Sequence, residues 1–471
     1  GANAQVLAAE EITIERQASD ANNSSVIING LVQTTGAAEN ILVQANGDVT
    51  LGANGDLLGG GQVQIRADVE SDGTGGVTMA DGAIAQASTG EVFVIASEDI
   101  LLGSVDAATR IRVESSDGSI LDNGDSAQDL ITDLAFLSAE TGIGTDANSL
   151  DSTVSQLVAR TDSGDIHLAN TGDLTITTHN PDGGGDVSGV EVLDTAAADP
   201  AVDTITIDVT GDLTVNSQVT NNAAGTVNLD ATVDILVNST VTSTGGNITL
   251  NSDTDQTTTA GGGIDISGAV TSNGGNITFG GGADPTTTAA IGTAGTSNDG
   301  VRITATGSLS SAAGSISIRG TSDSGNGVEV LGGGDVTSTT GSITINGSAT
   351  TGTGEEGVLL QGAGTTISSA DGDISITGTS ASVDGIRISD QVVISSTGTG
   401  AGASTITLTG SSTATTGNEY GILIQDAGTM ITSVDGDILL TGDSDALDGI
   451  RFTAGGVIAS TGTGANAASI T

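Results

Sequence analysis

Apolar residues along the chain fall in short alternating bursts, each bounded by glycine, asparagine, aspartate or serine. Residues 374–376 (Ile-Ser-Ile) and 386–388 (Ile-Arg-Ile) are examples. A period of two between turn-forming residues predicts a β-strand with a turn at each end, with the isoleucines facing inward and the middle residue facing solvent. Helical periodicity is nearly absent; residues 129–139 fit either a helical turn or two or a buried strand.

These bursts recur in units from residue 299 onward. Each unit opens with glycine and an apolar alternation, passes through a shorter apolar-serine step, and ends in a second alternating strand after a glycine turn. At an offset of 64 residues, about 30 of the 51 positions in 357–407 are identical to those in 421–471, so the true duplication spans two units, 357–420 and 421–471. The unit openings lie at 300–303, 327–330, 357–360, 385–388, 421–424 and 449–452.

A single unit is too small to fold by itself. About five buried aliphatic side chains stabilise it by roughly 1.5–3 kcal/mol each, whereas ordering the backbone costs about 1–2 kcal/mol per residue. Stacking coil on coil lets each strand pair with its equivalents at about 4.8 Å and turns the inward residues into continuous ladders. The repeat therefore predicts a parallel β-solenoid with three short strands per coil of about 20 to 36 residues, in place of a row of sandwich domains.

The domain organisation follows from breaks in this pattern. Residues 1–177 form a first predicted solenoid stretch, and residues 204–471 form a second. Residues 178–203 contain Pro181, Pro200 and three consecutive glycines, which predicts a linker or a loop excursion between them. The strand pattern resumes quickly, so we expect one continuous rod, cut from a longer polypeptide.

Composition and charge limit the kind of core, the partners and the cellular location that the chain can have. The 471 residues include 73 Gly, four Phe, one Tyr and no Trp, so the predicted core consists of small aliphatic residues. Nine basic and 58 acidic residues give a formal net charge of −49, which argues against nucleic-acid and anionic-membrane partners. The absence of cysteine excludes disulfides and Cys-ligated metal sites, and no apolar run reaches the length of a membrane helix. An acidic, cysteine-free chain suits an extracellular or cell-surface location.

A family resemblance is carried by residues 116–176, which include SDGSILD and, later, DSGDIHLANTGDLTI. Segments 47–51 (GDVTL) and 211–215 (GDLTV) and two GGNIT segments support it. This pattern resembles the modules of very large bacterial exoproteins of the filamentous-haemagglutinin type. The resemblance implies a right-handed parallel β-helix and a role as an adhesin, surface fibre or matrix component. The amino-terminal secretion module of that family is not present in this sequence.

Candidate chemistry is sparse. The Asp-Gly-Asp turns at Asp371, Asp373, Asp435 and Asp437 offer carboxylate and carbonyl oxygens to a calcium ion, although aspartate and glycine also serve as ordinary turn residues. No other cofactor is indicated. His167 and His179, the two histidines, lie twelve residues apart without cysteine, which argues against a metal site. Arg302, Arg387 and Arg451 recur at one place in the repeat, which favours outward positions facing acidic neighbours.

We therefore expect a secreted, cell-surface structural repeat protein of adhesin type: a rigid acidic stalk whose variable loops contact other cells, glycans or surface proteins. One alternative is a subunit of a filament, sheath or matrix that pairs end to end or laterally with copies of itself. The other is a polysaccharide-acting β-helix enzyme, which the scarcity of cationic and aromatic residues disfavours; we expect no catalytic residues. The variable loops that we expect at one edge are 320–326, 347–356, 378–384, 410–420 and 442–448.

Overall fold

The chain consists of β-strands and connecting turns throughout the part described by the computed structural model. About 52% of the residues lie in strands. Among the described residues there is no helix, and so none that could cross a membrane. The described residues are 5–16, 24–71, 73–124, 126–180, 186–194, 202–256, 261–293, 298–351, 354–400, 403–462 and 469–471.

Two compact units make up the chain. Unit 1 comprises Gly1–Thr210 and Asn216–Ala223, and unit 2 comprises Gly211–Val215 and Ala224–Thr471. The predicted linker, 178–203, falls within unit 1. It contains a short antiparallel pair, β20 (Thr178–His179) with β21 (Val187–Ser188), while Pro181 and Pro200 lie outside the described residues. The predicted division at this segment and the predicted single rod stay predictions.

Unit 1 is wound from parallel strands that pair in three ladders, for example Val49 with Val77 in the third. The first ladder is β1 (Gln5–Ala8), β4 (Leu31–Thr34), β7 (Leu57–Gly59), β10 (Ile84–Ala87), β13 (Ser104–Ala107) and β16 (Leu130–Ala139). The second is β2 (Ile12–Arg16), β5 (Ile41–Ala45), β8 (Val63–Arg66), β11 (Glu91–Ala96), β14 (Arg110–Ser115), β16 and β17 (Leu150–Thr161). The third is β3 (Val26–Ile28), β6 (Val49–Leu51), β9 (Val77–Met79), β12 (Ile100–Leu102) and β15 (Ile120–Asp122). The unit also contains β18 (Ile166–Asn170), β19 (Leu174–Ile176), β22 (Val190–Val192), β23 (Ile205–Val209) and β25 (Val219–Asn221).

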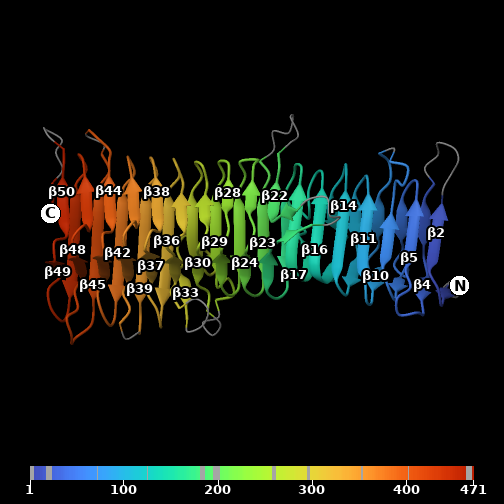
Figure 1. Cartoon of the computed structure of the whole chain (residues 1–471), viewed down its shortest axis with the longest axis horizontal. Helices are drawn as coiled ribbons and strands as arrows, with labels where there is room; N and C mark the ends of the chain where they lie inside the picture. The colour runs from blue at the N-terminus through green and yellow to red at the C-terminus, as the bar shows by residue number, and fades with distance from the viewer. Residues whose placement is uncertain are drawn as a thin grey trace. The chain divides into compact units, whose positions relative to one another are not determined.

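Unit 2 repeats the arrangement more regularly, and its strands lie side by side in Figure 1. Its first ladder is β24 (Leu213–Val215), β27 (Ile235–Val237), β30 (Ile264–Ile266), β34 (Val301–Ile303), β37 (Val328–Leu331), β40 (Val358–Gln361), β43 (Ile386–Ser389), β46 (Ile422–Gln425) and β49 (Ile450–Thr453). The second is β28 (Val241–Ser243), β31 (Ala269–Thr271), β35 (Ser308–Ser310), β38 (Asp335–Ser338), β41 (Thr366–Ser369), β44 (Val393–Ser396), β47 (Met430–Ser433) and β50 (Val457–Ser460). The third is β26 (Val227–Ala231), β29 (Ile248–Ser252), β32 (Ile277–Gly281), β36 (Ile316–Ser322), β39 (Ile343–Ala349), β42 (Ile374–Ser380), β45 (Ile406–Ser412) and β48 (Ile438–Ser444); β33 (Ala290–Gly292) pairs with the second half of β36.

The predicted all-β parallel solenoid with three strands per coil is confirmed. Coils of the expected 20 to 36 residues separate Ile100 from Ile120 and Ile386 from Ile422. The observed range is slightly wider, because Val94 pairs with Val113, 19 residues on, and Ile277 pairs with Ile316, 39 residues on. The apolar-serine step is the second-ladder strand of each coil in unit 2. The pattern left helix and strand open for residues 129–139; all but the first of them form strand β16, because their apolar residues continue the ladder of β14.

The core is the set of inward aliphatic side chains in these ladders. The isoleucines of 374–376 and 386–388 are fully buried, as predicted, and the middle residues face outward. In the third ladder of unit 2, Ile343, Ile374 and Ile406 stack in register with 0% exposure. Each isoleucine therefore packs against the same residue type in the coils on either side, which is the stabilisation that a single coil lacks.

The predicted positions of the variable loops need a correction, because each predicted loop begins inside a strand. The third-ladder strands from β36 onward run seven residues, through the glycine at which the loop was expected to start. The reason is a close approach of two backbones: a Cβ at Gly410 would lie 2.0 Å from the carbonyl oxygen of Gly421, the glycine that opens the next first-ladder strand. Glycine at both positions lets the strands pass each other, so it marks a contact and not a turn.

Candidate functional site

The four predicted calcium ligands lie at the corner between the second and third ladders of unit 2. Asp371 and Asp373 flank Gly372 before β42, and Asp435 and Asp437 occupy the same places two coils later, before β48. One coil lies between the two pairs. The backbone of Ile374 donates to the Thr405 carbonyl of that coil, and Ile406 of the same coil donates to the Asp437 carbonyl. The structure therefore does not bring the four carboxylates together.

Three of these carboxylates bind backbone amides of the neighbouring coil. Asp373 Oδ1 accepts the amide hydrogen of Thr405 at 2.8 Å, and Asp435 Oδ2 accepts that of Gly400 at 2.7 Å. Asp437 Oδ1 accepts both the amide and the hydroxyl of Ser469 at 2.8 Å, and these bonds lower the pKa of Asp437. Within the described ranges no group of three or more His, Asp or Glu side chains could hold a metal ion.

The same device recurs along the chain and was missed in the sequence. The residue just before a strand is often aspartate or asparagine, and its side chain caps the equivalent amide one coil further on, as Asp99 does for Ser119 and Asn247 for Asn276. Short carboxylate and amide side chains suit this, because they reach nearby backbone donors without leaving the turn. The recurring Asp-Ile and Asn-Ile pairs at strand starts are the signal that could have revealed it.

Replacing Asp373 with alanine is expected to lower the free energy of unfolding by about 1 kcal/mol, because the Thr405 amide loses its side-chain acceptor. Urea unfolding followed by circular dichroism measures this. Asp371→Ala is the matched control, since Asp371 is exposed at the same turn. If millimolar calcium instead stabilised the wild type and neither variant, the carboxylates would be metal ligands and the capping role would be wrong.

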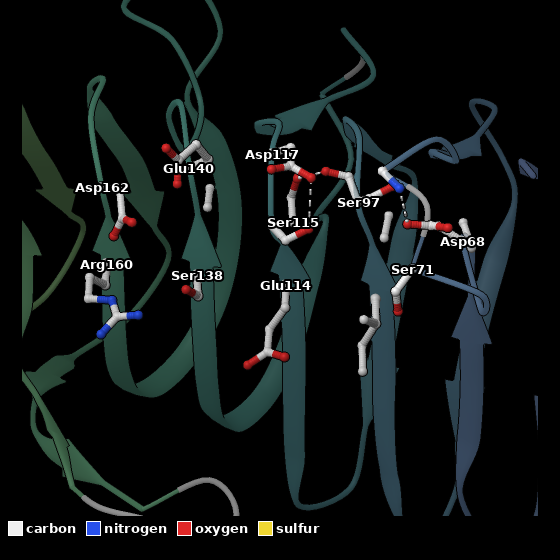
Figure 2. A pocket seen from close by; sticks show the side chains of 16 residues that line it. Asp68, Ser71, Ser97, Glu114, Ser115, Asp117, Ser138, Glu140, Arg160 and Asp162 are labelled. Carbon is white, nitrogen blue, oxygen red and sulfur yellow. Dashed lines mark hydrogen bonds between the residues drawn. The ribbon is translucent and has the colours of Figure 1, made fainter. Parts of the chain in front are cut away.

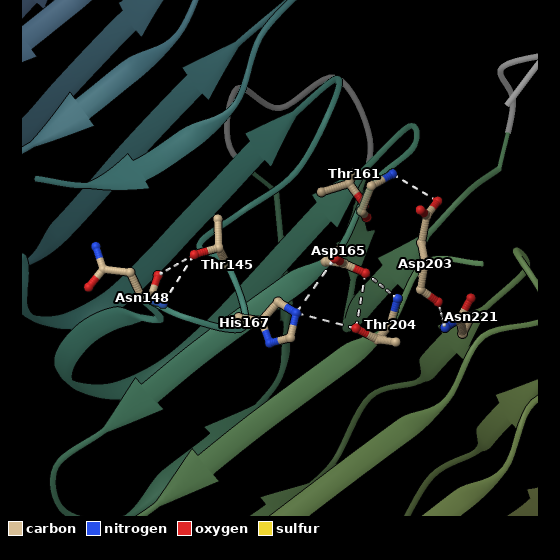
Figure 3. A network of polar contacts seen from close by, with 9 residues as sticks. Thr145, Asn148, Thr161, Asp165, His167, Asp203, Thr204 and Asn221 are labelled. Carbon is tan, nitrogen blue, oxygen red and sulfur yellow. Dashed lines mark hydrogen bonds and ion pairs between the residues drawn. The ribbon is translucent and has the colours of Figure 1, made fainter. Parts of the chain in front are cut away.

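The two histidines lie in separate polar networks of unit 1. His167 is 4% exposed on β18; its Nε2 lies 3.3 Å from Thr204 Oγ1 and 3.7 Å from Asp165 Oδ2 (Figure 3). Asp165 also accepts the Thr204 amide at 2.6 Å, and the contact with His167 is the main reason that the pKa of Asp165 is lowered. His179 contacts Arg110 at 2.7 Å. His167 thus links two neighbouring coils, whereas the His179 contact joins strand β14 to the β20–β21 pair, 69 residues further along the chain.

A groove of about 450 Å³ lies in unit 1 where strands β8, β11, β14, β16 and β17 end (Figure 2). Glu140 is one of the residues that line this groove, and burial together with the neighbouring Asp162 raises its pKa. Carboxylates outnumber guanidinium groups, so the groove attracts cations and repels anions. Its charged lining residues are Asp68, Glu114, Asp117, Glu140, Asp162 and Arg160.

The most strongly perturbed groups lie on what we call the charged face: the outward side of the first ladder of unit 2 and the residues just before its strands. Arg302 of β34 contacts three carboxylates there. Its Nε lies 3.0 Å from Glu329 Oε2 and 4.0 Å from Asp299 Oδ2, and its Nη1 lies 3.6 Å from Asp265 Oδ2. The three acidic side chains are 12–21% exposed, so one guanidinium faces three half-buried or buried carboxylates.

The charged face continues over the next coils. Arg387 of β43 binds Glu356 at 3.1 Å, and Asp384 accepts the Tyr420 amide at 2.8 Å. Burial raises the pKa of Asp384 to about 6 despite that hydrogen bond, and it also raises the pKa of Glu356. Arg451 lies over the Tyr420 ring, 5.0 Å from its centre. The prediction that the recurrent arginines face acidic neighbours is confirmed for Arg302 and Arg387, whereas Arg451 stacks on an aromatic ring.

Parts of two predicted loops border this face. Residues 324–326 and 354–356 line a groove of about 470 Å³ together with Asp265, Arg302 and Glu329. The groove is polar and acidic, and the uncharged Leu359 of β40 also lines it. The loop residues that the repeat pattern identified as variable therefore lie next to the residues whose ionisation is most perturbed.

No protein-family model matches the chain, and no curated protein sequence or solved structure matches it either. The resemblance to exoproteins of the filamentous-haemagglutinin type thus stays a prediction.

Proposed function

We propose that the chain is a secreted, cell-surface structural repeat protein of adhesin type, whose variable loops contact glycans or proteins of another cell. The observation that carries the proposal is the gathering of loop residues 324–326 and 354–356 around a 470 Å³ groove on one side of unit 2. A ladder-built core holds its surface in place without depending on any single loop. Loops of different lengths on such a scaffold provide a binding surface that varies without cost to the fold.

The acidic charge bears on the class of partner. A net charge of −49 repels nucleic acids and acidic polysaccharides at low salt, and it favours neutral or cationic surfaces. A catalytic role receives no support from the charged face, where carboxylates bind arginine and backbone amides. We therefore propose binding without chemistry, outside the cell.

The loop between β45 and β46 offers a clean test. Residues 413–419 connect Ser412 to Tyr420, whereas the equivalent connection one coil earlier needs only residues 381–383. Replacing 413–419 by the three residues Ala-Ser-Val of 381–383 keeps Tyr420, whose amide binds Asp384. We expect unchanged circular dichroism and thermal unfolding, with weaker binding of the full chain to cells and to immobilised neutral glycans.

Deleting residues 354–355 shortens a second loop where it lines the groove. We expect this deletion to weaken binding further. Binding that survives both changes, with the fold intact, would remove the loops from the proposal. Ordered fibres in electron micrographs of the purified chain would instead favour the filament alternative.

A further inference from the structure

Charge is unbalanced around Glu329. Its side chain is 12% exposed, and Arg302 Nε reaches its Oε2 at 3.0 Å, while Asn326 Nδ2 donates to its Oε1 at 3.0 Å. The same guanidinium lies within 4.0 Å of carboxylate oxygens of Asp265 and Asp299. With all three acids ionised the group carries two excess negative charges in a poorly solvated place, which is unfavourable unless a proton or a cation joins it.

Among the described residues that line this groove, the elements around Glu329 contribute further acids and no cationic side chain other than Arg302. Strand β30 contributes Asp265, the turn before β34 contributes Asp299, and β34 itself contributes Arg302. On the other side, the turn before β40 contributes Glu355 and Glu356, and Arg387 binds the latter at 3.1 Å. Strand β40 adds only the uncharged Leu359. A proton is thus the simplest compensating charge for this cluster.

We propose that the cluster of Asp265, Asp299 and Glu329 around Arg302 is a proton-operated latch in unit 2. Uptake of a proton in mildly acidic surroundings binds strands β34 and β37 and the turns before them more tightly. Its release at alkaline pH loosens the same strands and the groove that they border.

The direction of the effect follows from the ionisation of Glu329. Burial is the largest cause, followed by the nearby Asp299; together they raise the pKa of Glu329 from 4.5 to about 7. A carboxyl whose pKa is higher in the folded than in the unfolded chain stabilises the fold fully below the unfolded value, and this stabilisation disappears as the pH rises through the folded value. Burial also raises the pKa of Asp265, so this neighbour acts in the same direction.

A local measurement is needed, because acidification also relieves the general repulsion of a chain with net charge −49. Hydrogen–deuterium exchange of the full chain at pH 5.5 and pH 8.0, corrected for intrinsic exchange rates, reports on peptides that contain β34 and β37. In the wild type we expect their protection to be roughly tenfold higher at pH 5.5.

Glu329→Gln keeps the shape and the hydrogen-bonding capacity of the side chain but cannot ionise. We expect this variant to show nearly the same protection at both pH values, close to that of the acid form of the wild type. The control is Asp371→Asn, an exposed acid of the same unit that should keep the pH response of the wild type. A wild type with equal protection at both pH values, or a Glu329→Gln variant with an undiminished response, would overturn the latch.

Discussion

Replacing Gly410 with alanine is expected to lower the free energy of unfolding of unit 2 by about 3 kcal/mol. The added Cβ would lie 2.0 Å from the carbonyl oxygen of Gly421 and 2.7 Å from the Ile422 side chain. Backbone atoms cannot rotate away as a side chain does, so β45 and β46 would have to separate. Since Gly378 and Gly385 meet in the same way one coil earlier, the displacement would spread to neighbouring coils. Urea unfolding measures the loss.

Gly245→Ala is the matched control for this substitution. The nearest atom to a Cβ at Gly245 is the Ala224 side chain at 3.5 Å, an ordinary contact, so alanine fits there. This variant should be neutral or more stable by up to about 1 kcal/mol, because alanine restricts the unfolded chain. Equal destabilisation by both variants would show that the glycines are needed for backbone freedom and not for close approach.

Replacing Ile376 with alanine is expected to cost about 2–5 kcal/mol, the usual effect of a cavity in a packed core. Ile376 is fully buried and stacks between Ile345 and Leu408 in the third ladder. Neither neighbour can fill the space, because each is held in register by its own strand pairing. The loss appears in urea unfolding as a lower midpoint.

Two milder substitutions in the same strand serve as comparisons for Ile376→Ala. Ile376→Val removes one methylene and should cost about 0.5–1.5 kcal/mol. Thr377→Ala, on the outward side of the same strand, should change stability by no more than about 0.5 kcal/mol. A large effect at Thr377 with a small one at Ile376 would mean that the inward and outward sides of β42 are reversed.

The regular parts of the fold were accessible from the sequence because each is a local pattern. Alternation identified the strands of 374–376 and 386–388 and correctly predicted which side chains are buried. Repetition at about 28 residues then implied stacking, because coils of this size cannot be stable alone. Glycine was misread at Gly410, where composition suggested a turn and the structure shows two backbones in close contact.

The charged face was not accessible in the same way. Asp265, Arg302 and Glu329 become neighbours only through the pairing register of β30, β34 and β37, and the connections between these strands differ in length. A hydrophobic pattern fixes which side of a strand is buried, but not which residue of the next coil lies opposite a given outward side chain. The recurrent arginines pointed only to Arg302, and the three acids around it became neighbours through the register and the turn before β34.

Distances between spin labels in unit 2 test most directly whether successive coils stack in register. The chain lacks cysteine, so pairs can be introduced at outward positions of the third ladder, with Ser317 fixed and Thr407 or Leu439 as the second site. The structure places these second sites three and four coils away, which predicts narrow distributions near 14 and 19 Å at about 4.8 Å per coil, plus the length of the labels. Broad distributions, or separations that do not increase by one strand spacing per coil, would contradict the stacked solenoid.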